Sequence, residues 1–222
     1  MDLIVRQFGL CDYQTIYDAM RRFSNLRQAG TKDELWCLEH TPVYTLGLGG
    51  QLRHVISPGN IPVIKVDRGG QVTYHGPGQL IVYCLLDLHR RSLGTKSYVR
   101  LLEQSVIGML AEQGLEAARK DGAPGVYIDG RKIAALGIRV RRGCSYHGLA
   151  LNVDVDLSPF HGINPCGYPD LEITRLQDEG LEINVVQASE LLLPHLCRHL
   201  DITEETLSGG VEKTFMSSGM AA

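Results

Sequence analysis

The residues with the clearest chemical potential are one cysteine and one lysine. Cys166 lies in the segment INPCGYPD, between Pro165 and Gly167. Proline restricts its own backbone and glycine admits an unusual dihedral, so we expect the thiol on a tight, exposed turn that a substrate can approach. Lys132 opens an apolar run in GRKIAALG, where partial desolvation would let its amine interact with a thiolate. Cys166 is the candidate nucleophile and Lys132 its charged partner, although a lone turn cysteine can also be chemically silent.

Composition and cysteine spacing exclude several classes of protein. The 22 Lys and Arg against 25 Asp and Glu leave a net charge of -3, so no basic excess supports nonspecific binding to nucleic acid. The six cysteines are scattered, without a CxxC pair or the His/Cys spacing of a zinc site, which favours reduced thiols in the cytoplasm. No signal-peptide pattern and no apolar run of about 18 residues occurs, so we expect no membrane span.

The hydrophobic pattern predicts a mixed α and β domain. Apolar spacing indicates a helix over about 13–23 and another over about 96–113, with Thr95 as its N-cap and Gly114 at its end. A third helix over about 185–200 should be kinked or shortened by Pro194. We expect strands over 3–8, 34–40, 42–47 and 62–67, followed by a strand over 80–88 that is buried on both faces.

Three further strands are expected over 125–128, 131–140 and 145–153. Asp129-Gly130 and Arg142-Gly143 supply turns between them, which predicts an antiparallel meander. The length of 222 residues fits one domain. We place the catalytic domain at 1–206 and expect a flexible C-terminal tail at 207–222.

A glycine-rich segment, RGGQVTYHGPGQ at 68–79, precedes the buried strand. Its glycines allow backbone to lie against a narrow ligand, so the segment is interpreted as a pocket wall. It lacks the GxxxxGK pattern and the GxGxxG spacing of nucleotide-binding loops, which argues against a phosphate cradle. His75 could hydrogen-bond a substrate or brace the loop.

Four segments taken together resemble one family. RGGQVTYHGPGQ, GRKIAALG, HGLALNV and INPCG occur in the order and at the spacing of the lipoyl(octanoyl) transferases, and the similarity runs from about Leu3 to Leu200. The resemblance implies an α+β single domain with the biotin/lipoyl protein ligase fold. That fold has a mixed sheet, a smaller antiparallel sheet and flanking helices.

The resemblance also implies a reaction. An octanoyl group would pass from octanoyl acyl carrier protein to Cys166 as a thioester. It would then pass to the acceptor lysine of lipoyl domains in 2-oxo acid dehydrogenase complexes or of the glycine-cleavage carrier protein. Lys132 would stabilise the thiolate and serve as a base toward the acceptor amine. No cofactor or metal is implied, because a thioester is already activated toward an amine.

By the same resemblance, the remaining motif positions bind the acyl chain and its carbonyl group. Without the family likeness, the small residues among them would be interpreted as ordinary core residues. The positions implied to bind substrate are Arg68, Gly69, Gly70, Gln71, Val72, Thr73, Tyr74, His75, Ala135, Leu136, Gly137, Gly148, Leu149 and Ala150.

Other interpretations stay open at the level of sequence. His147 or His161 would make a Cys/His hydrolase if either folded beside Cys166. An ATP-dependent lipoate or biotin ligase would share the fold but needs no nucleophilic cysteine. A noncatalytic acyl-binding module is a third alternative. Four carboxylates without EF-hand spacing are interpreted as solvated charges rather than a cation site: Asp154, Asp156, Asp170 and Glu172.

Overall fold

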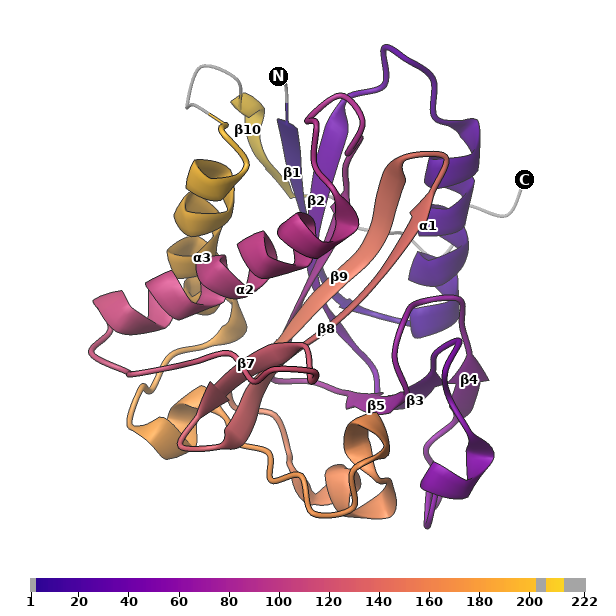
Figure 1. The fold of residues 1–222 in the computed structure, drawn as a ribbon, viewed down its shortest axis with the longest axis vertical. Coiled ribbons are helices and arrows are strands. Elements are labelled where there is room, and N and C mark those ends of the chain that lie inside the picture. The colour runs from indigo at the N-terminus through magenta and orange to yellow at the C-terminus, as the bar shows by residue number, and fades with distance from the viewer. Residues whose placement is uncertain (1–2, 203–206, 214–222) are drawn as a thin grey trace.

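The computed structural model describes residues 3–202 and 207–213. The strands form one large sheet and one small sheet, and helices pack against the large sheet (Figure 1). None of the helices within these ranges is long and apolar enough to cross a membrane. In chain order the elements are β1 (Leu3–Cys11), α1 (Tyr13–Leu26), β2 (Asp33–His40), β3 (Val43–Leu46), η1 (Leu52–His54), β4 (Val63–Lys65), β5 (Val72–His75), β6 (Gln79–Leu85), α2 (Thr95–Glu112), β7 (Gly125–Ile128), β8 (Arg131–Arg141), β9 (Cys144–Asn152), η2 (Ser158–Gly162), η3 (Pro165–Gly167), η4 (Leu176–Glu179), α3 (Val185–His199) and β10 (Leu207–Lys213).

The large sheet is mixed, with strand order β10-β1-β2-β6-β9-β8-β7. Its first three strands are parallel and the pairs from β2 onward are antiparallel. Helices α2 and α3 cover one face and α1 covers the other (Figure 1). In β6, Leu80 and Val82 face α2 and α3, whereas Ile81 and Tyr83 face α1. Burial on both faces explains why this strand is continuously apolar, as predicted.

The small sheet has the order β4-β3-β5 and is packed on a cluster that includes Tyr44, Tyr74 and Phe160. Pairing between β3 and β5 is antiparallel, but β3 and β4 are parallel. The expectation of a purely antiparallel small sheet was therefore wrong. The chain crosses over through residues 47–62 before β4, and this long connection returns it in the same direction as β3.

The predicted meander of β7, β8 and β9 is confirmed by antiparallel pairing throughout. Both two-residue turns use positive φ angles, 48° at Asp129 and 81° at Gly130, then 50° at Arg142 and 75° at Gly143. Such pairs match the twist of the flanking strands. The turns thus set the register of β8, which carries Lys132.

Three local predictions need correction. The N-cap of α2 is Gly94, and Thr95 is the first helical residue. Helix α3 is not shortened at Pro194 but continues to His199. Residues 207–213, which the sequence pattern placed in a tail, form β10 and pair with β1 in parallel. The predicted domain boundary at 206 thus leaves out an edge strand of the large sheet. Residues 203–206 and 214–222 lie outside the described residues.

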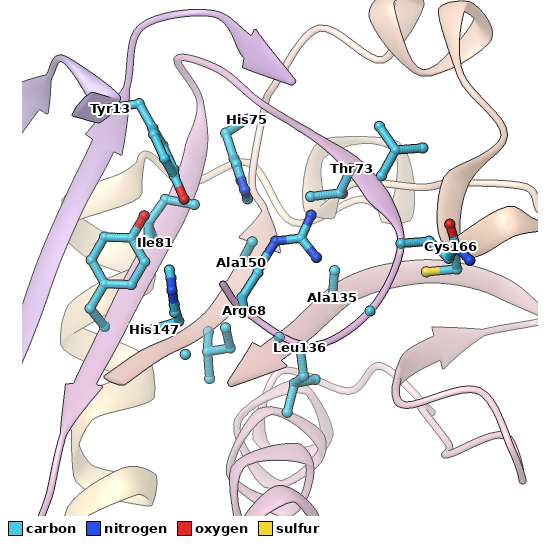
Figure 2. Close-up of a pocket in the computed structure, with 17 residues that line it drawn as sticks. Tyr13, Arg68, Thr73, His75, Ile81, Ala135, Leu136, His147, Ala150 and Cys166 are labelled. Carbon is cyan, nitrogen blue, oxygen red and sulfur yellow. The ribbon is translucent and has the colours of Figure 1, made fainter. Parts of the chain in front are cut away.

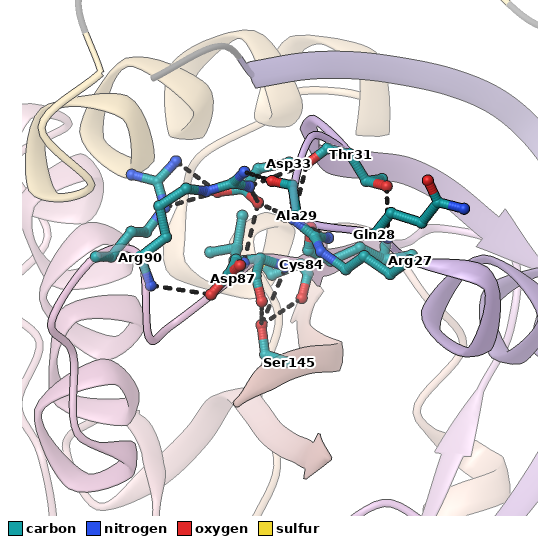
Figure 3. A network of polar contacts seen from close by, with 12 residues as sticks. Arg27, Gln28, Ala29, Thr31, Asp33, Cys84, Asp87, Arg90 and Ser145 are labelled. Carbon is teal, nitrogen blue, oxygen red and sulfur yellow. Dashed lines mark hydrogen bonds and ion pairs between the residues drawn. The ribbon is translucent and has the colours of Figure 1, made fainter. Parts of the chain in front are cut away.

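A buried ionic cluster joins distant parts of the chain at the start of β2 (Figure 3). The Asp33 side chain is fully buried and pairs with three arginines. Arg90 donates to Asp33 Oδ1 at 2.7 Å and Arg91 to Oδ2 at 2.8 Å, while Arg27 also bonds Oδ1. The cluster ties α1, β2 and the loop after β6 together, and Arg91 adds a bond to the carbonyl of Leu200.

Candidate active site

Cys166 and Lys132 lie together although 34 positions separate them in the chain. Lys132 Nζ is 3.0 Å from Cys166 Sγ. Cys166 occupies the middle of η3 with a φ of 57°, a left-handed conformation that non-glycine residues rarely adopt and that surrounding contacts must hold. Those contacts are the amides of Gly167 and Tyr168, which donate to the carbonyls of Asn164 and Pro165 at 2.9 and 3.0 Å. The turn is as predicted, but the cysteine is half-buried rather than exposed.

The backbone of Lys132 is held at its amide and its carbonyl by residues 172–174. Lys132 donates its amide to the Glu172 carbonyl at 2.8 Å, and its carbonyl accepts from Thr174 at 3.0 Å. The segment a few residues after Cys166 therefore runs alongside β8. The same cysteine turn is held from its other side by η1, where the His54 carbonyl accepts from the Asn164 amide at 2.8 Å.

The side chain of Lys132 is buried, with 3% of the residue exposed. Its Nζ donates to the Pro124 carbonyl at 3.2 Å and lies 5.2 Å from the centre of the Tyr127 ring. Burial alone would lower the pKa of Lys132. The interaction with Cys166, and then that with Tyr127, outweighs this effect and raises the pKa of Lys132 above its ordinary value. The ammonium form of Lys132 is therefore favoured at its position beside Cys166 Sγ.

A narrow pocket extends from Cys166 across the sheet (Figure 2). The space open to the centre of a water molecule is about 50 Å³, enough for a few waters or for a thin chain in their place. It is lined by twelve of the positions predicted to bind substrate: Arg68, Gly70, Gln71, Val72, Thr73, His75, Ala135, Leu136, Gly137, Gly148, Leu149 and Ala150.

Two predicted positions do not line the pocket. Gly69 donates its amide to the Ile138 carbonyl at 3.0 Å, which attaches the glycine-rich segment to β8. Tyr74 is buried against Tyr44 and Phe160 in the core of the small sheet. Alternation along β5 explains the second case, because Tyr74 points away from the face that Thr73 presents to the pocket.

Residues on three neighbouring strands form the floor of the pocket, and those on β8 and β9 are small. Ile81, Ala150 and Ala135 are opposite one another on β6, β9 and β8, and Tyr83, Gly148 and Gly137 form the next row. A Cβ placed on Gly137 would lie 3.0 Å from Arg68 Cδ. The glycine-rich segment therefore covers β8 closely, and small side chains beneath it keep the channel open.

A hydrogen-bonded network braces the glycine-rich segment that covers the pocket. Arg68 donates to the Thr45 carbonyl at 2.7 Å and to its hydroxyl at 2.8 Å. His75 bonds the same hydroxyl at 3.3 Å and Gln79 Oε1 at 2.7 Å, and Gln79 donates to Asn152 at 2.8 Å. Burial lowers the pKa of His75 to about 3, so the ring is neutral near pH 7. Of the two predicted roles, the geometry shows His75 bracing the loop.

Four pocket residues were not predicted: Tyr13, Ile81, Tyr83 and His147. Tyr13 lies at the start of the helix predicted over about 13–23, and no motif marked it as a pocket residue. Ile81 and Tyr83 could have been found from the strand register. Residues two apart on β6 lie on one face of the sheet, and that face also carries the predicted residues Ala150 and Gly148 of β9. That register becomes known only when the strands are paired.

The histidines do not support a Cys/His arrangement. His147 Nε2 bonds Asp67 Oδ1 at 3.0 Å. Figure 2 shows His147 at the opposite side of the pocket from Cys166. His161 is exposed. Among residues 3–202 and 207–213, no group of three or more His, Cys, Asp or Glu side chains is placed to hold a metal. Asp156 instead accepts a hydrogen bond from the Ser158 amide at 2.9 Å.

Comparison with solved structures shows the fold. Lipoate-protein ligase A bound with ATP superimposes with a TM-score of 0.78 at 14% identity, covering 98% of this chain and 90% of that one. A biotin protein ligase from Aquifex aeolicus with biotin and ATP gives 0.55 at 12% identity, covering 90% and 71%. These likenesses confirm the predicted biotin/lipoyl ligase architecture.

Comparison of sequences shows the family. The lipoyl protein ligase A/B catalytic domain matches residues 12–197. An octanoyltransferase of Chromobacterium violaceum is 51% identical over 206 residues, covering 93% of this chain and all of the relative. One from Azoarcus sp. is 58% identical over 199 residues, covering 89% and 88%. The chain therefore belongs to the lipoyl protein ligase A/B catalytic domain family and, within it, to the octanoyltransferases.

Proposed function

We propose that this chain transfers an octanoyl group from octanoyl acyl carrier protein to the acceptor lysine of a lipoyl domain, through a thioester on Cys166. One observation carries the proposal: Lys132 Nζ lies 3.0 Å from Cys166 Sγ, at one end of a pocket floored by alanine and glycine. A nucleophile with a charged partner beside a narrow apolar channel suits a reaction on a fatty acyl group.

In the first step the thiolate of Cys166 attacks the carbonyl carbon of the donor thioester. A new carbon–sulfur bond forms to Cys166 and the bond to the donor sulfur breaks. The donor thiolate leaves and takes a proton from the Lys132 ammonium. The acyl chain lies along the floor of Ala135, Ala150 and Gly137, where each fully buried methylene gains up to about 0.8 kcal/mol.

Acylation changes the surroundings of Lys132. A thioester carries no charge, so the contribution of the Cys166 thiolate to the lysine pKa disappears, while the burial that lowers the pKa remains. Having given its proton to the donor thiolate, Lys132 is left as a neutral amine. It can accept the proton that the acceptor lysine loses as its nitrogen attacks the thioester. The carbon–sulfur bond to Cys166 then breaks, an amide forms, and the thiolate–ammonium pair is restored.

The proposed acceptors are lipoyl domains of 2-oxo acid dehydrogenase complexes and the glycine-cleavage carrier protein. A solved archaeal lipoylation system, a bipartite lipoate protein ligase with its E2 lipoyl domain from Thermoplasma acidophilum, shares the fold with a TM-score of 0.77 at 16% identity. The reaction as written needs no cofactor, because the thioester supplies the free energy for the amide bond. Free thiols at all six cysteines suit a reducing cytoplasm, where we place the reaction.

Intact mass spectrometry tests the intermediate. Incubation with octanoyl acyl carrier protein, without ATP, should add one octanoyl group that hydroxylamine removes. The adduct should be absent in Cys166→Ala and present in Cys144→Ala, a matched control at another half-buried cysteine. Adding a purified lipoyl domain should move the label to that domain.

Three outcomes would contradict the proposal. An adduct that survives in Cys166→Ala would place the acyl group elsewhere. Transfer that requires ATP would indicate a ligase. Release of free octanoate in place of transfer to the lipoyl domain would indicate a hydrolase.

A further inference from the structure

We propose that Tyr13 and Tyr83 form the end wall of the pocket, and that this wall sets the length of the acyl chain. The inference rests on the proposed function, because it assigns the acyl chain to the channel beside Cys166. It adds the residues that would make the enzyme select octanoyl over longer chains.

The floor of the channel has a defined length. From β8 to β6 it crosses two strand spacings of about 4.8 Å each. It begins at Ala135 and Gly137 and ends at Ile81 and Tyr83. That span is close to the length of an extended octanoyl chain. The floor residues of β8 and β9 are glycine and alanine, whereas the β6 residues are large, so the free path stops at β6.

Tyr13 closes the same end from α1. Figure 2 shows Tyr13 and Cys166 on opposite sides of the pocket, with Arg68 between them. Both tyrosines are almost fully buried, with 2% of Tyr13 and 5% of Tyr83 exposed. The Tyr83 hydroxyl bonds His40 Nε2 at 2.8 Å. The ring of His40 lies 4.8 Å from that of Tyr13.

The end wall is therefore polar as well as closed. Burial lowers the pKa of His40 to about 4, so its neutral Nε2 can accept the Tyr83 proton. A longer chain would have to press its methyl group against the hydrogen-bonded Tyr83 hydroxyl in a dry site. One more buried methylene gains at most about fourfold in binding, whereas a hydroxyl left without a partner costs about tenfold or more. The cost exceeds the gain, so the chain ends where the hydroxyls begin.

The test is a competition between two donors. Wild-type enzyme and variants are incubated with equimolar octanoyl and decanoyl acyl carrier protein, and intact mass gives the ratio of the two adducts at early times. Tyr13→Phe removes one hydroxyl and leaves a roomier, less polar wall, so the decanoyl-to-octanoyl ratio should rise about tenfold. Tyr83→Phe removes the other hydroxyl of the end wall, so it should independently shift the ratio in the same direction.

Two further variants sharpen the result. Tyr17→Phe is the matched control, because Tyr17 lies one turn along α1, bonds Asp67 at 3.0 Å and does not line the pocket. Its ratio should equal that of wild type. Ala150→Val narrows the floor before the end wall is reached, so it should favour hexanoyl over octanoyl donor when those two compete.

The outcomes separate the two proposals. A wild-type octanoyl adduct with an unchanged ratio in both Tyr13→Phe and Tyr83→Phe would overturn the end wall and leave the proposed function standing. An equal shift in Tyr17→Phe would also overturn it, since the effect would then be a general loosening of α1. No octanoyl adduct on wild-type enzyme would overturn both.

Discussion

Lys132 Nζ and Cys166 Sγ are 3.0 Å apart because the chain passes back along β8 after the cysteine turn. The link is the pair of backbone hydrogen bonds between Lys132 and residues Glu172 and Thr174. The β7–β9 meander fixes the position of Lys132. The pairing of residues 172–174 with β8 holds the Cys166 turn next to it. Displacing either segment would separate the two groups, so their contact depends on the fold.

Replacing Lys132 by arginine should separate charge from basicity. Lys132→Arg keeps a cation beside the thiolate but supplies a guanidinium, which is a different shape and a poor base. We expect the octanoyl adduct to form, more slowly, and its transfer to the lipoyl domain to fall by about 100-fold or more. Single-turnover mass spectrometry measures the two steps separately, with Lys65→Arg at an exposed position as the control. Near-normal transfer by Lys132→Arg would contradict the base assignment.

Gly148 should tolerate no side chain. A Cβ at this position would lie 2.0 Å from the Val82 carbonyl oxygen, and backbone cannot move aside cheaply within the β6–β9 pairing. We expect Gly148→Ala to lower the free energy of unfolding by about 1–3 kcal/mol or more. Gly30→Ala is the control, since a Cβ there meets nothing within 4 Å. Equal urea midpoints for the two variants would refute the proposed close approach of β6 and β9.

Asp33 should be a major stabilising residue although it is remote from the pocket. Its buried carboxylate pairs with Arg27, Arg90 and Arg91 (Figure 3). Asp33→Asn removes the only charge that these pairs share, so we expect a loss of about 3–5 kcal/mol in urea unfolding. The control is Asp129→Asn, whose side chain is 86% exposed and 3.9 Å from its arginine, and which should change stability by less than about 0.5 kcal/mol. Similar losses in both would show that the cluster contributes little.

The buried histidines should make folding sensitive to mild acid. Burial lowers the pKa of His40 to about 4, against about 6.5 for an unfolded histidine. Between these values the unfolded chain binds more protons, so stability must fall as the pH drops from about 6.5 toward 4. His40→Gln cannot titrate and should lose less stability over that interval than wild type. Urea titrations at several pH values measure this, with exposed His161→Gln as the control. A wild-type slope in His40→Gln would exclude His40 as the titrating group.

Much of the fold was predictable because its signals are local. The doubly buried β6, the meander with its two turns and the approximate helix positions follow from apolar periodicity and from residues that permit positive φ. The errors arose where pairing over long distances decides. β10 joins the sheet beside β1 despite two glycines in its sequence, and β4 runs parallel to β3 because of a long crossover. Composition alone does not report either pairing.

The sequence by itself determined which residues could do the chemistry: a cysteine set between proline and glycine, a lysine at the start of an apolar strand, and small residues in four ordered motifs. Only the tertiary structure decided that Lys132 reaches Cys166, that Tyr74 turns into the core and that Tyr13 and Tyr83 close the pocket. The physical reason is that residue type sets what a group can do, whereas reactivity and selectivity depend on distances of a few ångströms. Those distances are created by strand register and by contacts between segments far apart in the chain.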